Sequence, residues 1–375
     1  MKNTEKFLSR IHCHRPILYF LAILFFFTTN SCSSAPVISP ENAIIPETPE
    51  DTNTPEIKTP GDGNITDKNI LYVGRWDKSD NTVFHSYWTG AYLRVNFTGK
   101  SIGIKLRSNT SLVVSIDGET PRAVVGQSGI TLLNTTTLSE GTHTLLVGSA
   151  GQNYEVEFEG LVLDKNAVTY PPDKKLLIEY IGDSITAFGG SDNTPTVNYA
   201  WQTAELLGCD HTQISFSGLS LSSGYGCLDT KIGMDSLYFN LKNYNHIHER
   251  PVIPWNFSYT PDIVFIFLGT NDECGQAPEE VVSLNSRNMI YKIRQKFNDA
   301  EIFVMRPFKG IYENALSSAV RRLNSMGDEK IHFIDTTGWL SESDFSDGTH
   351  PNETGTSKII NKLVPTLKPF VKNNF

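Results

Sequence analysis

The pattern of apolar residues changes once along the chain, and this change limits the folds that are open to it. Between about residues 71 and 164, apolar residues occupy every second position in YLRVNF, SIGIKL, SLVVSIDG, HTLLVG and YEVEFEGLVLD. Such alternation is typical of strands with one buried face, and Gly or Asn-Thr punctuation separates the runs. The regular spacing of these runs predicts an all-β sandwich of jelly-roll type over residues 67–170.

From residue 175 onward the apolar runs are continuous: KLLIEYIG, HTQISFSG, PDIVFIFLG, AEIFVMRPF and IHFIDTT. Continuous runs of this length indicate strands that are buried on both faces. Helical segments separate them at residues 198–208, 278–297, 314–327 and 355–370. Strands that alternate with helices predict a parallel sheet in a three-layer α/β domain over residues 171–375, which begins at Pro171-Pro172.

Residues 1–32 have the layout of an export signal. A basic start precedes the apolar stretch PILYFLAILFFFTT, which is too short to cross a membrane comfortably. The sequence NSCSS follows and resembles the signal of a bacterial lipoprotein, in which Cys32 would become the lipid-modified first residue. We expect an exported protein that is either anchored in the bacterial cell envelope through Cys32 or secreted.

The amino-acid composition predicts a linker between the leader and the folded part, and the net charge limits the partners that the protein can bind. Residues 33–66 are rich in Pro, Thr, Ser and Glu and nearly lack aromatic residues, which predicts a disordered linker. The chain of 375 residues has a formal net charge of −9. An acidic protein repels phosphate backbones, so we expect no nucleic-acid partner. Contact with the membrane is expected only through the lipid anchor, and the protein is expected to be a monomer.

Three cysteines, Cys209, Cys227 and Cys274, lie beyond the leader. Three thiols cannot all pair with one another, so the chain is not a disulfide scaffold. The sequence has neither a Cys-x-x-Cys pair nor a Cys/His spacing typical of zinc sites. We therefore expect no metal and no cofactor.

Polar residues of the kind that acyl transfer needs follow the predicted parallel strands. Ser184 follows the first strand in GDS, Gly218 follows the second in SFSG, and Asn271 follows the third in GTND. Asp347 and His350 follow the last strand in SDGTHP. Because parallel sheets bind ligands at the carboxyl ends of their strands, we expect these residues to meet at one edge of the sheet.

The chemistry of acyl transfer gives each of these residues a role. A serine hydroxyl is a weak nucleophile until a base takes its proton, and imidazole titrates near neutral pH, so Ser184 and His350 form a nucleophile and base. Asp347 would fix the tautomer of His350. The backbone N–H groups of Ser184 and Gly218 and the side-chain amide of Asn271 are candidate donors to an oxyanion.

Each residue also has a purely structural interpretation. Ser184 could cap a helix, Gly218 could serve a tight turn, Asn271 could satisfy its own turn, and His350 could be a surface loop residue. The ordered combination, with each residue at a predicted strand end, favours the catalytic interpretation.

Two neighbouring carboxylates, Asp183 and Asp272, are assigned no catalytic role. We expect both to hold their loops by accepting hydrogen bonds from backbone N–H groups.

The four blocks resemble those of the SGNH (GDSL-type) hydrolase superfamily, which is named for the Ser, Gly, Asn and His that occur here as Ser184, Gly218, Asn271 and His350. The segments ISFSG and PWNFSYTPDIVFIFLGTND are similar to those of carbohydrate esterase family 2, whose members carry an N-terminal β-sandwich. The resemblance implies an esterase that removes O-acetyl groups from a polysaccharide such as xylan or glucomannan through an acyl-enzyme. This chain continues with GLSLSSGYG where the family usually has glycine and basic residues, and some members lack the Asp.

The long segment between the second and third parallel strands contains aromatic residues. Aromatic faces stack on sugar rings, so Tyr225 and Trp255 are candidate contacts for an acetylated carbohydrate. The alternative is that any one of these residues packs the insertion against the sheet.

Two other functions fit the same sequence. A broad-specificity esterase or lipase would keep the Ser-His-Asp set and hydrolyse longer acyl groups, although no long apolar stretch in the α/β region suggests an acyl-chain tunnel. A non-catalytic protein would bind glycan through the sandwich and leave the α/β region inert, but the complete Ser-Gly-Asn-His set argues against this alternative.

Overall fold

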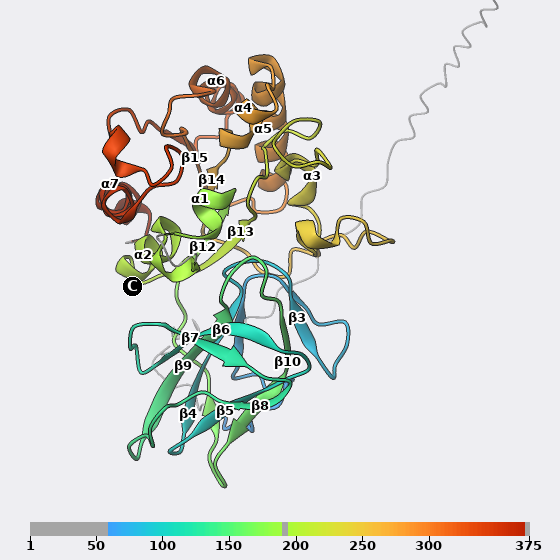
Figure 1. The fold of residues 1–375 in the computed structure, drawn as a ribbon, viewed down its shortest axis with the longest axis vertical. Helices are drawn as coiled ribbons and strands as arrows, with labels where there is room; N and C mark the ends of the chain where they lie inside the picture. The colour runs from blue at the N-terminus through green and yellow to red at the C-terminus, as the bar shows by residue number, and fades with distance from the viewer. Residues whose placement is uncertain (1–58, 190–193, 372–375) are drawn as a thin grey trace, which may run out of the picture. The chain divides into compact units, whose positions relative to one another are not determined.

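The computed structural model describes residues 59–189 and 194–371 (Figure 1). The predicted export signal, Cys32 and most of the predicted linker lie outside these residues. Among the helices that are described, none is both long enough and apolar enough to span a membrane.

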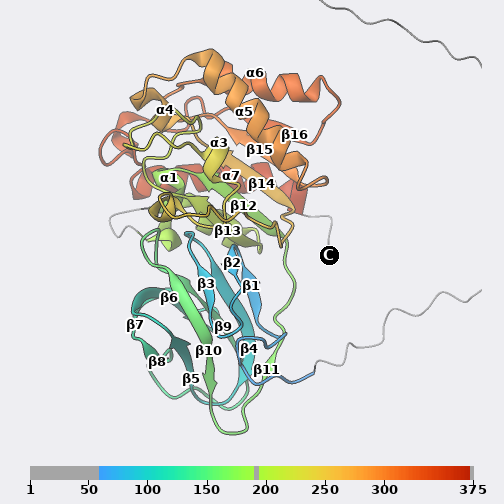
Figure 2. The ribbon, with the colours of Figure 1, turned by 90° about the vertical axis from the view of Figure 1, so that its right-hand side faces the viewer.

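The first part of the described chain is a β-sandwich of two antiparallel sheets (Figure 2). One sheet contains, in order, β1 (Leu71–Val73), β4 (Tyr92–Thr98), β9 (Thr142–Ser149), β6 (Thr110–Ile116) and β7 (Arg122–Gly126), with β11 (Thr169–Tyr170) beside β4. The other contains β2 (Trp76–Asp77), β3 (Phe84–Ser86), β10 (Val156–Leu163), β5 (Ile102–Leu106) and β8 (Gly129–Leu132). Alternate residues of each long strand point inward, and Leu93, Val95, Ile104 and Phe158 are fully buried between the sheets.

The sandwich begins earlier in the chain than the sequence predicted. Gly61 pairs with Thr169, and Asn64 pairs with Gly160. These pairs form between segments that are about a hundred residues apart, and they use backbone groups, so the polar composition of the segment gave no sign of them. The prediction of disorder is therefore wrong for residues 61–64.

The second part of the described chain contains a five-stranded parallel sheet. Its order is β13 (Asp210–Ser215), β12 (Leu177–Gly182), β14 (Ile263–Phe267), β15 (Glu301–Met305) and β16 (Ile331–Ile334). All five strands lie on the continuous apolar runs of the sequence. Because β12 lies between the second and third strands of the chain, the sheet changes winding direction beside it, and such a point commonly holds the ligand of an open α/β sheet.

Helices cover both faces of this sheet (Figure 1). One face packs against α2 (Tyr199–Leu206) and α7 (Glu353–Val371), and the other packs against α5 (Glu279–Arg294) and α6 (Glu313–Asn324). These four helices match the periodic segments of the sequence. Three further helices of one turn, α1 (Ser184–Ala187), α3 (Met234–Leu237) and α4 (Thr270–Cys274), are too short to produce a periodic pattern.

A disulfide between Cys227 and Cys274 joins the insertion that follows β13 to the end of α4. The sequence left the pairing of the three cysteines open, and Cys209 is the buried free thiol. The bridge ties the insertion to the helix that carries Asn271.

The sandwich covers the edge of the parallel sheet that β13 forms. Every residue of β13 is buried, although β13 is an edge strand. Gly90 of the sandwich lies so close to β13 that a Cβ atom on it would be 2.5 Å from the side chain of Gln213, and its φ of 68° also favours glycine. Arg94 of β4 also forms an ion pair of 2.7 Å with Asp210. An uncovered edge would present unpaired backbone groups, so the sandwich protects this strand.

Arg75 of the sandwich reaches into the insertion that follows β13. Its side chain is fully buried, and its Nη1 donates to the carbonyl oxygens of Tyr238 at 2.5 Å and Asn240 at 2.8 Å. The guanidinium also lies 4.6 Å from the ring centroid of Tyr238 and 5.3 Å from that of Trp255. Hydrogen bonds to buried carbonyls and contacts with aromatic faces offset part of the cost of removing this charge from water, although Nε and Nη2 have no hydrogen-bond partner among the described residues.

Candidate active site

The register of the parallel sheet brings the first three sequence blocks together. Gly182 at the end of β12 pairs with Ser215 of β13 and with Phe267 of β14. Ser184 and Gly218 follow within a few residues of these pairs. A side chain at Gly182 would collide with Thr186, so the sharp turn from β12 into α1 requires glycine.

Ser184, His350 and Asp347 form a continuous chain of hydrogen bonds. The Ser184 Oγ lies 2.8 Å from the His350 Nε2, and the His350 Nδ1 lies 2.7 Å from the Asp347 Oδ2. The structure thus brings a hydroxyl, an imidazole and a carboxylate into the order that a nucleophile, a base and an orienting group require.

Backbone hydrogen bonds hold Asp347 in the ionised form. Its Oδ1 accepts from the N–H of His350 at 2.8 Å and from that of Thr349 at 2.9 Å. The backbone bond from His350, followed by the bond from its side chain, lowers the pKa of Asp347 to about 2. The carboxylate therefore stays charged near neutral pH, although about half of its side chain is exposed.

Asn271 bridges the first and second blocks. Its Nδ2 donates to the Asp183 Oδ2 at 3.2 Å and to the carbonyl oxygen of Leu219 at 3.1 Å. The side chain is therefore fixed beside the two residues that adjoin Ser184 and Gly218. Because both amide hydrogens have acceptors, an oxyanion would have to share one of them.

Two backbone N–H groups are free to bind an oxyanion. Among the residues that the structure describes, the N–H groups of Ser184 and Gly218 donate to no acceptor. Gly218 has φ of 80°, and a Cβ atom there would lie 2.8 Å from the side chain of Leu228. Glycine is thus required by both conformation and space, which is consistent with a turn that exposes its amide.

Asp183 and Asp272 hold loops, as the sequence predicted. The Asp183 Oδ1 accepts from the N–H of Ile185 at 3.0 Å, and burial raises the pKa of this carboxyl to about 7. Asp272 accepts from the N–H groups of Leu221 at 2.6 Å and Ser222 at 2.9 Å, and burial raises its pKa as well. These bonds fix the turns that surround Ser184 and Gly218.

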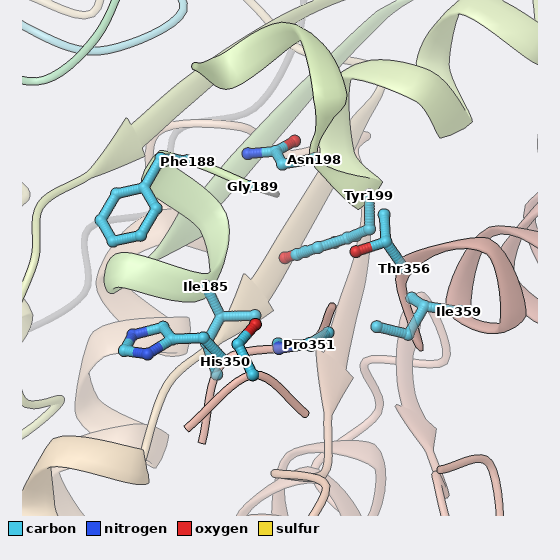
Figure 3. A pocket seen from close by; sticks show the side chains of 10 residues that line it. Ile185, Phe188, Gly189, Asn198, Tyr199, His350, Pro351, Thr356 and Ile359 are labelled. Carbon is cyan, nitrogen blue, oxygen red and sulfur yellow. The ribbon is translucent and has the colours of Figure 1, made fainter. Parts of the chain in front are cut away.

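A small cavity lies beside His350 (Figure 3). Its volume is about 30 Å³, and the side chains that line it include Ile185, Tyr199 and Ile359. The Phe188 ring also lines this cavity, and its centroid lies 5.7 Å from that of the His350 ring. A space of this size holds about one water molecule or one methyl group.

The two aromatic candidates for sugar contacts differ in their surroundings. Trp255 is only 3% exposed and packs in the core beneath Arg75, so the prediction that it stacks on a sugar ring is wrong. The docked sandwich, which the local sequence does not reveal, covers this ring. Tyr225 is half-buried in the insertion, and its contact with substrate remains a prediction.

One side chain beside the site was not predicted from the sequence. Gln152 of the sandwich accepts hydrogen bonds from the N–H of Ser217 at 2.8 Å and from its hydroxyl at 3.0 Å. Gln152 belongs to no motif and lies in the other domain, so only the docked structure could bring it to the residue before Gly218.

The assembled groups are those of acyl transfer: a hydroxyl, a base, an orienting carboxylate and N–H donors. Across residues 59–189 and 194–371, no three His, Cys, Asp or Glu side chains are arranged to hold a metal ion.

Two family models match the chain, one for each domain. Residues 72–172 match the family described as "Carbohydrate esterase 2 N-terminal". Residues 180–357 match the "GDSL-like Lipase/Acylhydrolase family". The first match covers the sandwich, and the second runs from β12 into α7.

A curated relative and two solved structures have similar sequences or folds. The chain is 27% identical to "Cellulase/esterase CelE" of Acetivibrio thermocellus, with 84% of this chain but only 41% of that protein covered. A family two carbohydrate esterase from Clostridium thermocellum, solved with cellohexaose, is 25% identical with a TM-score of 0.68 over 80% of this chain and 98% of its own. An acetyl xylan esterase from Butyrivibrio proteoclasticus shares the fold, with a TM-score of 0.69, 19% identity and coverage of 83% and 97%.

Together the two family models cover most of both domains. The GDSL-like match contains Ser184, Gly218, Asn271 and His350. Over residues 180–357 the chain resembles the GDSL-like lipases and acylhydrolases, and over both domains it is similar to the carbohydrate esterases of family 2.

Proposed function

We propose that this protein is a serine esterase that removes O-acetyl groups from an acetylated polysaccharide or oligosaccharide. The observation that carries the proposal is the hydrogen-bonded chain from Ser184 through His350 to Asp347. The carbohydrate part of the proposal is supported by the similarity to the family two esterase that was solved with cellohexaose. The reaction needs water as its only co-substrate.

In the proposed mechanism, His350 Nε2 takes the proton of Ser184 as its Oγ attacks the ester carbonyl. The protonated His350 then donates this proton to the sugar oxygen as the carbon–oxygen bond breaks, which leaves an acetyl group on Ser184. Water, deprotonated by His350, then attacks this acetyl-enzyme, and His350 returns the proton to the Ser184 Oγ as the acyl bond breaks and acetate leaves. Asp347 keeps the Nδ1 proton of His350 in place and stabilises the imidazolium that forms in each half-reaction.

The tetrahedral intermediates carry a negative oxygen that needs donors. The N–H groups of Ser184 and Gly218, which donate to no acceptor among the described residues, are the first two. The Asn271 amide is the third, and it would shift part of a hydrogen bond from Leu219 or Asp183 to the oxyanion. Donors that are oriented in advance favour the transition state over the substrate.

The length of the acyl group is the point on which the two candidate esterases differ. A broad-specificity esterase is the second candidate, and relative rates on p-nitrophenyl acetate, butyrate and octanoate separate the two. A rate that falls steeply with chain length supports an acetyl esterase, and a flat profile would contradict it.

We predict that Ser184→Ala lowers acetate release from p-nitrophenyl acetate and from acetylated xylan by at least about 10³-fold, because no other group replaces the nucleophile. Ser325→Ala, at the exposed end of α6, is the control and should keep full activity. If Ser184→Ala retained near-full activity, the acyl-enzyme mechanism would be wrong. A wild-type protein that bound glycan but released no acetate would support the non-catalytic alternative.

We predict that Asp347→Asn lowers kcat by up to about 10⁴-fold, because the amide cannot stabilise the required tautomer and the imidazolium. The substitution retains a side-chain oxygen that can accept from the N–H groups of Thr349 and His350, so the loop should keep its shape. Steady-state kinetics of the purified variant check this. A loss of less than about tenfold would make Asp347 a loop residue and leave a Ser184–His350 dyad.

We predict that Asn271→Ala lowers kcat by about 10²–10³-fold and leaves KM within a few-fold, as expected for one donor to an oxyanion. Asn271→Asp should be worse, because a carboxylate would repel the oxyanion. Thermal unfolding of the same variants separates this role from the bridge to Asp183 and Leu219. A variant with a lowered Tm and an unchanged kcat would show that Asn271 only joins the two loops.

We also propose that the protein is exported and anchored through a lipid on Cys32. The leader sequence supports this, and the Cys227–Cys274 disulfide fits an oxidising compartment. Cys32→Ala should move the protein from the membrane fraction to the soluble fraction of the producing cell. Unchanged fractionation of this variant would contradict the lipid anchor.

A further inference from the structure

The sandwich touches the loop that carries Gly218 through the side chain of Gln152. Gln152 lies in the connection between β9 and β10, and its Oε1 accepts from both the N–H and the hydroxyl of Ser217. Ser217 directly precedes Gly218. One oxygen atom of the sandwich therefore holds the residue next to the proposed oxyanion donor.

This contact matters because Asn271 and Asp272 hold residues that follow Gly218, whereas Gln152 holds the residue that precedes it. Gly218 has φ of 80°, and glycine tolerates a wide range of backbone angles. The N–H of Leu219 reaches the carbonyl oxygen of Phe216 at only 3.4 Å, which is a weak bond. Anchoring the N–H and the side chain of Ser217 restrains the peptide unit that joins Ser217 to Gly218, and the Gly218 N–H belongs to that unit.

The connection that carries Gln152 is held against the insertion by other contacts. The buried Asn243 donates from its Nδ2 to the carbonyl oxygen of Tyr87 and, in a weak bond of 3.4 Å, to that of Gln152. In the same connection, Glu155 lies 2.5 Å from the Nε2 of His246. These contacts fix the β9–β10 connection against the insertion without using the side chain of Gln152.

We propose that Gln152 is a positioning residue for catalysis: the sandwich domain, through this side chain, sets the orientation of the Gly218 N–H toward the oxyanion. The inference rests on the proposed function. It assigns the sandwich a part in the chemical step itself, in addition to any contact that this domain makes with glycan.

The domains should stay docked when Gln152 is changed. Several bonds between the domains do not involve Gln152. Arg75 donates to the carbonyl oxygens of Tyr238 and Asn240, and Trp88 donates to that of Leu241. Arg94 forms the ion pair with Asp210. A local change at Gln152 can therefore alter the Ser217–Gly218 turn without separating the domains.

The test compares three variants of the full chain. Gln152→Met keeps the length of the side chain but removes the acceptor, Gln152→Glu keeps an acceptor oxygen, and Asn153→Ala is an exposed neighbour that serves as the control. We expect Gln152→Met to lower kcat on p-nitrophenyl acetate by about 10- to 100-fold, the scale of a small misplacement, with KM within about twofold. Gln152→Glu should recover most of this loss, and Asn153→Ala should match the wild type.

Hydrogen exchange supplies a readout that does not depend on turnover. In Gln152→Met, exchange of the amides in a peptide spanning residues 214–221 should rise at least about tenfold, while peptides from β12 and β14 stay unchanged. An unchanged kcat in Gln152→Met, or an equal loss in Gln152→Glu with no change in exchange, would overturn the inference. A wild type without esterase activity would instead refute the proposed function, and the exchange experiment distinguishes these two failures.

Discussion

The pairing of β12 with both of its neighbours is the constraint on which the candidate site depends. Gly182 lies opposite Ser215 on one side and Phe267 on the other, so three separate loops leave the sheet at one level. The backbone register of these strands therefore brings Ser184, Gly218 and Asn271 close together, independently of any side-chain bond. Shifting one strand by a residue would turn its side chains to the opposite face and separate the groups.

The interface between the two domains is the second feature that shapes the site. The sandwich covers the edge strand β13, inserts Arg75 among aromatic rings and places Gln152 against Ser217. Covering an edge strand is a general need of an open sheet, and this protein meets it with a whole domain. The loop after β13 is therefore shaped from two sides: by the sheet it leaves and by the sandwich that contacts it.

Several features of the fold could be predicted because they depend on local pattern. The switch from alternating to continuous apolar runs identified both domains, and the four long helices carry apolar residues with helical periodicity. The one-turn helices α1 and α4 were missed because four or five residues cannot show a period. The pairing of Gly61 with Thr169 was missed because it joins backbone groups that are far apart in the sequence.

The sequence by itself determined the fold class, the family resemblance and the candidates Ser184, Gly218, Asn271, Asp347 and His350, because each of these residues has a fixed place beside a strand. Only the tertiary structure decided which aromatic rings are buried and which side chains cross between domains. Trp255 was assigned to substrate from its residue type, whereas docking of the sandwich buries it beneath Arg75. Gln152 gave no signal at all. A contact between domains depends on how two folded surfaces meet, and no local pattern of residues records that.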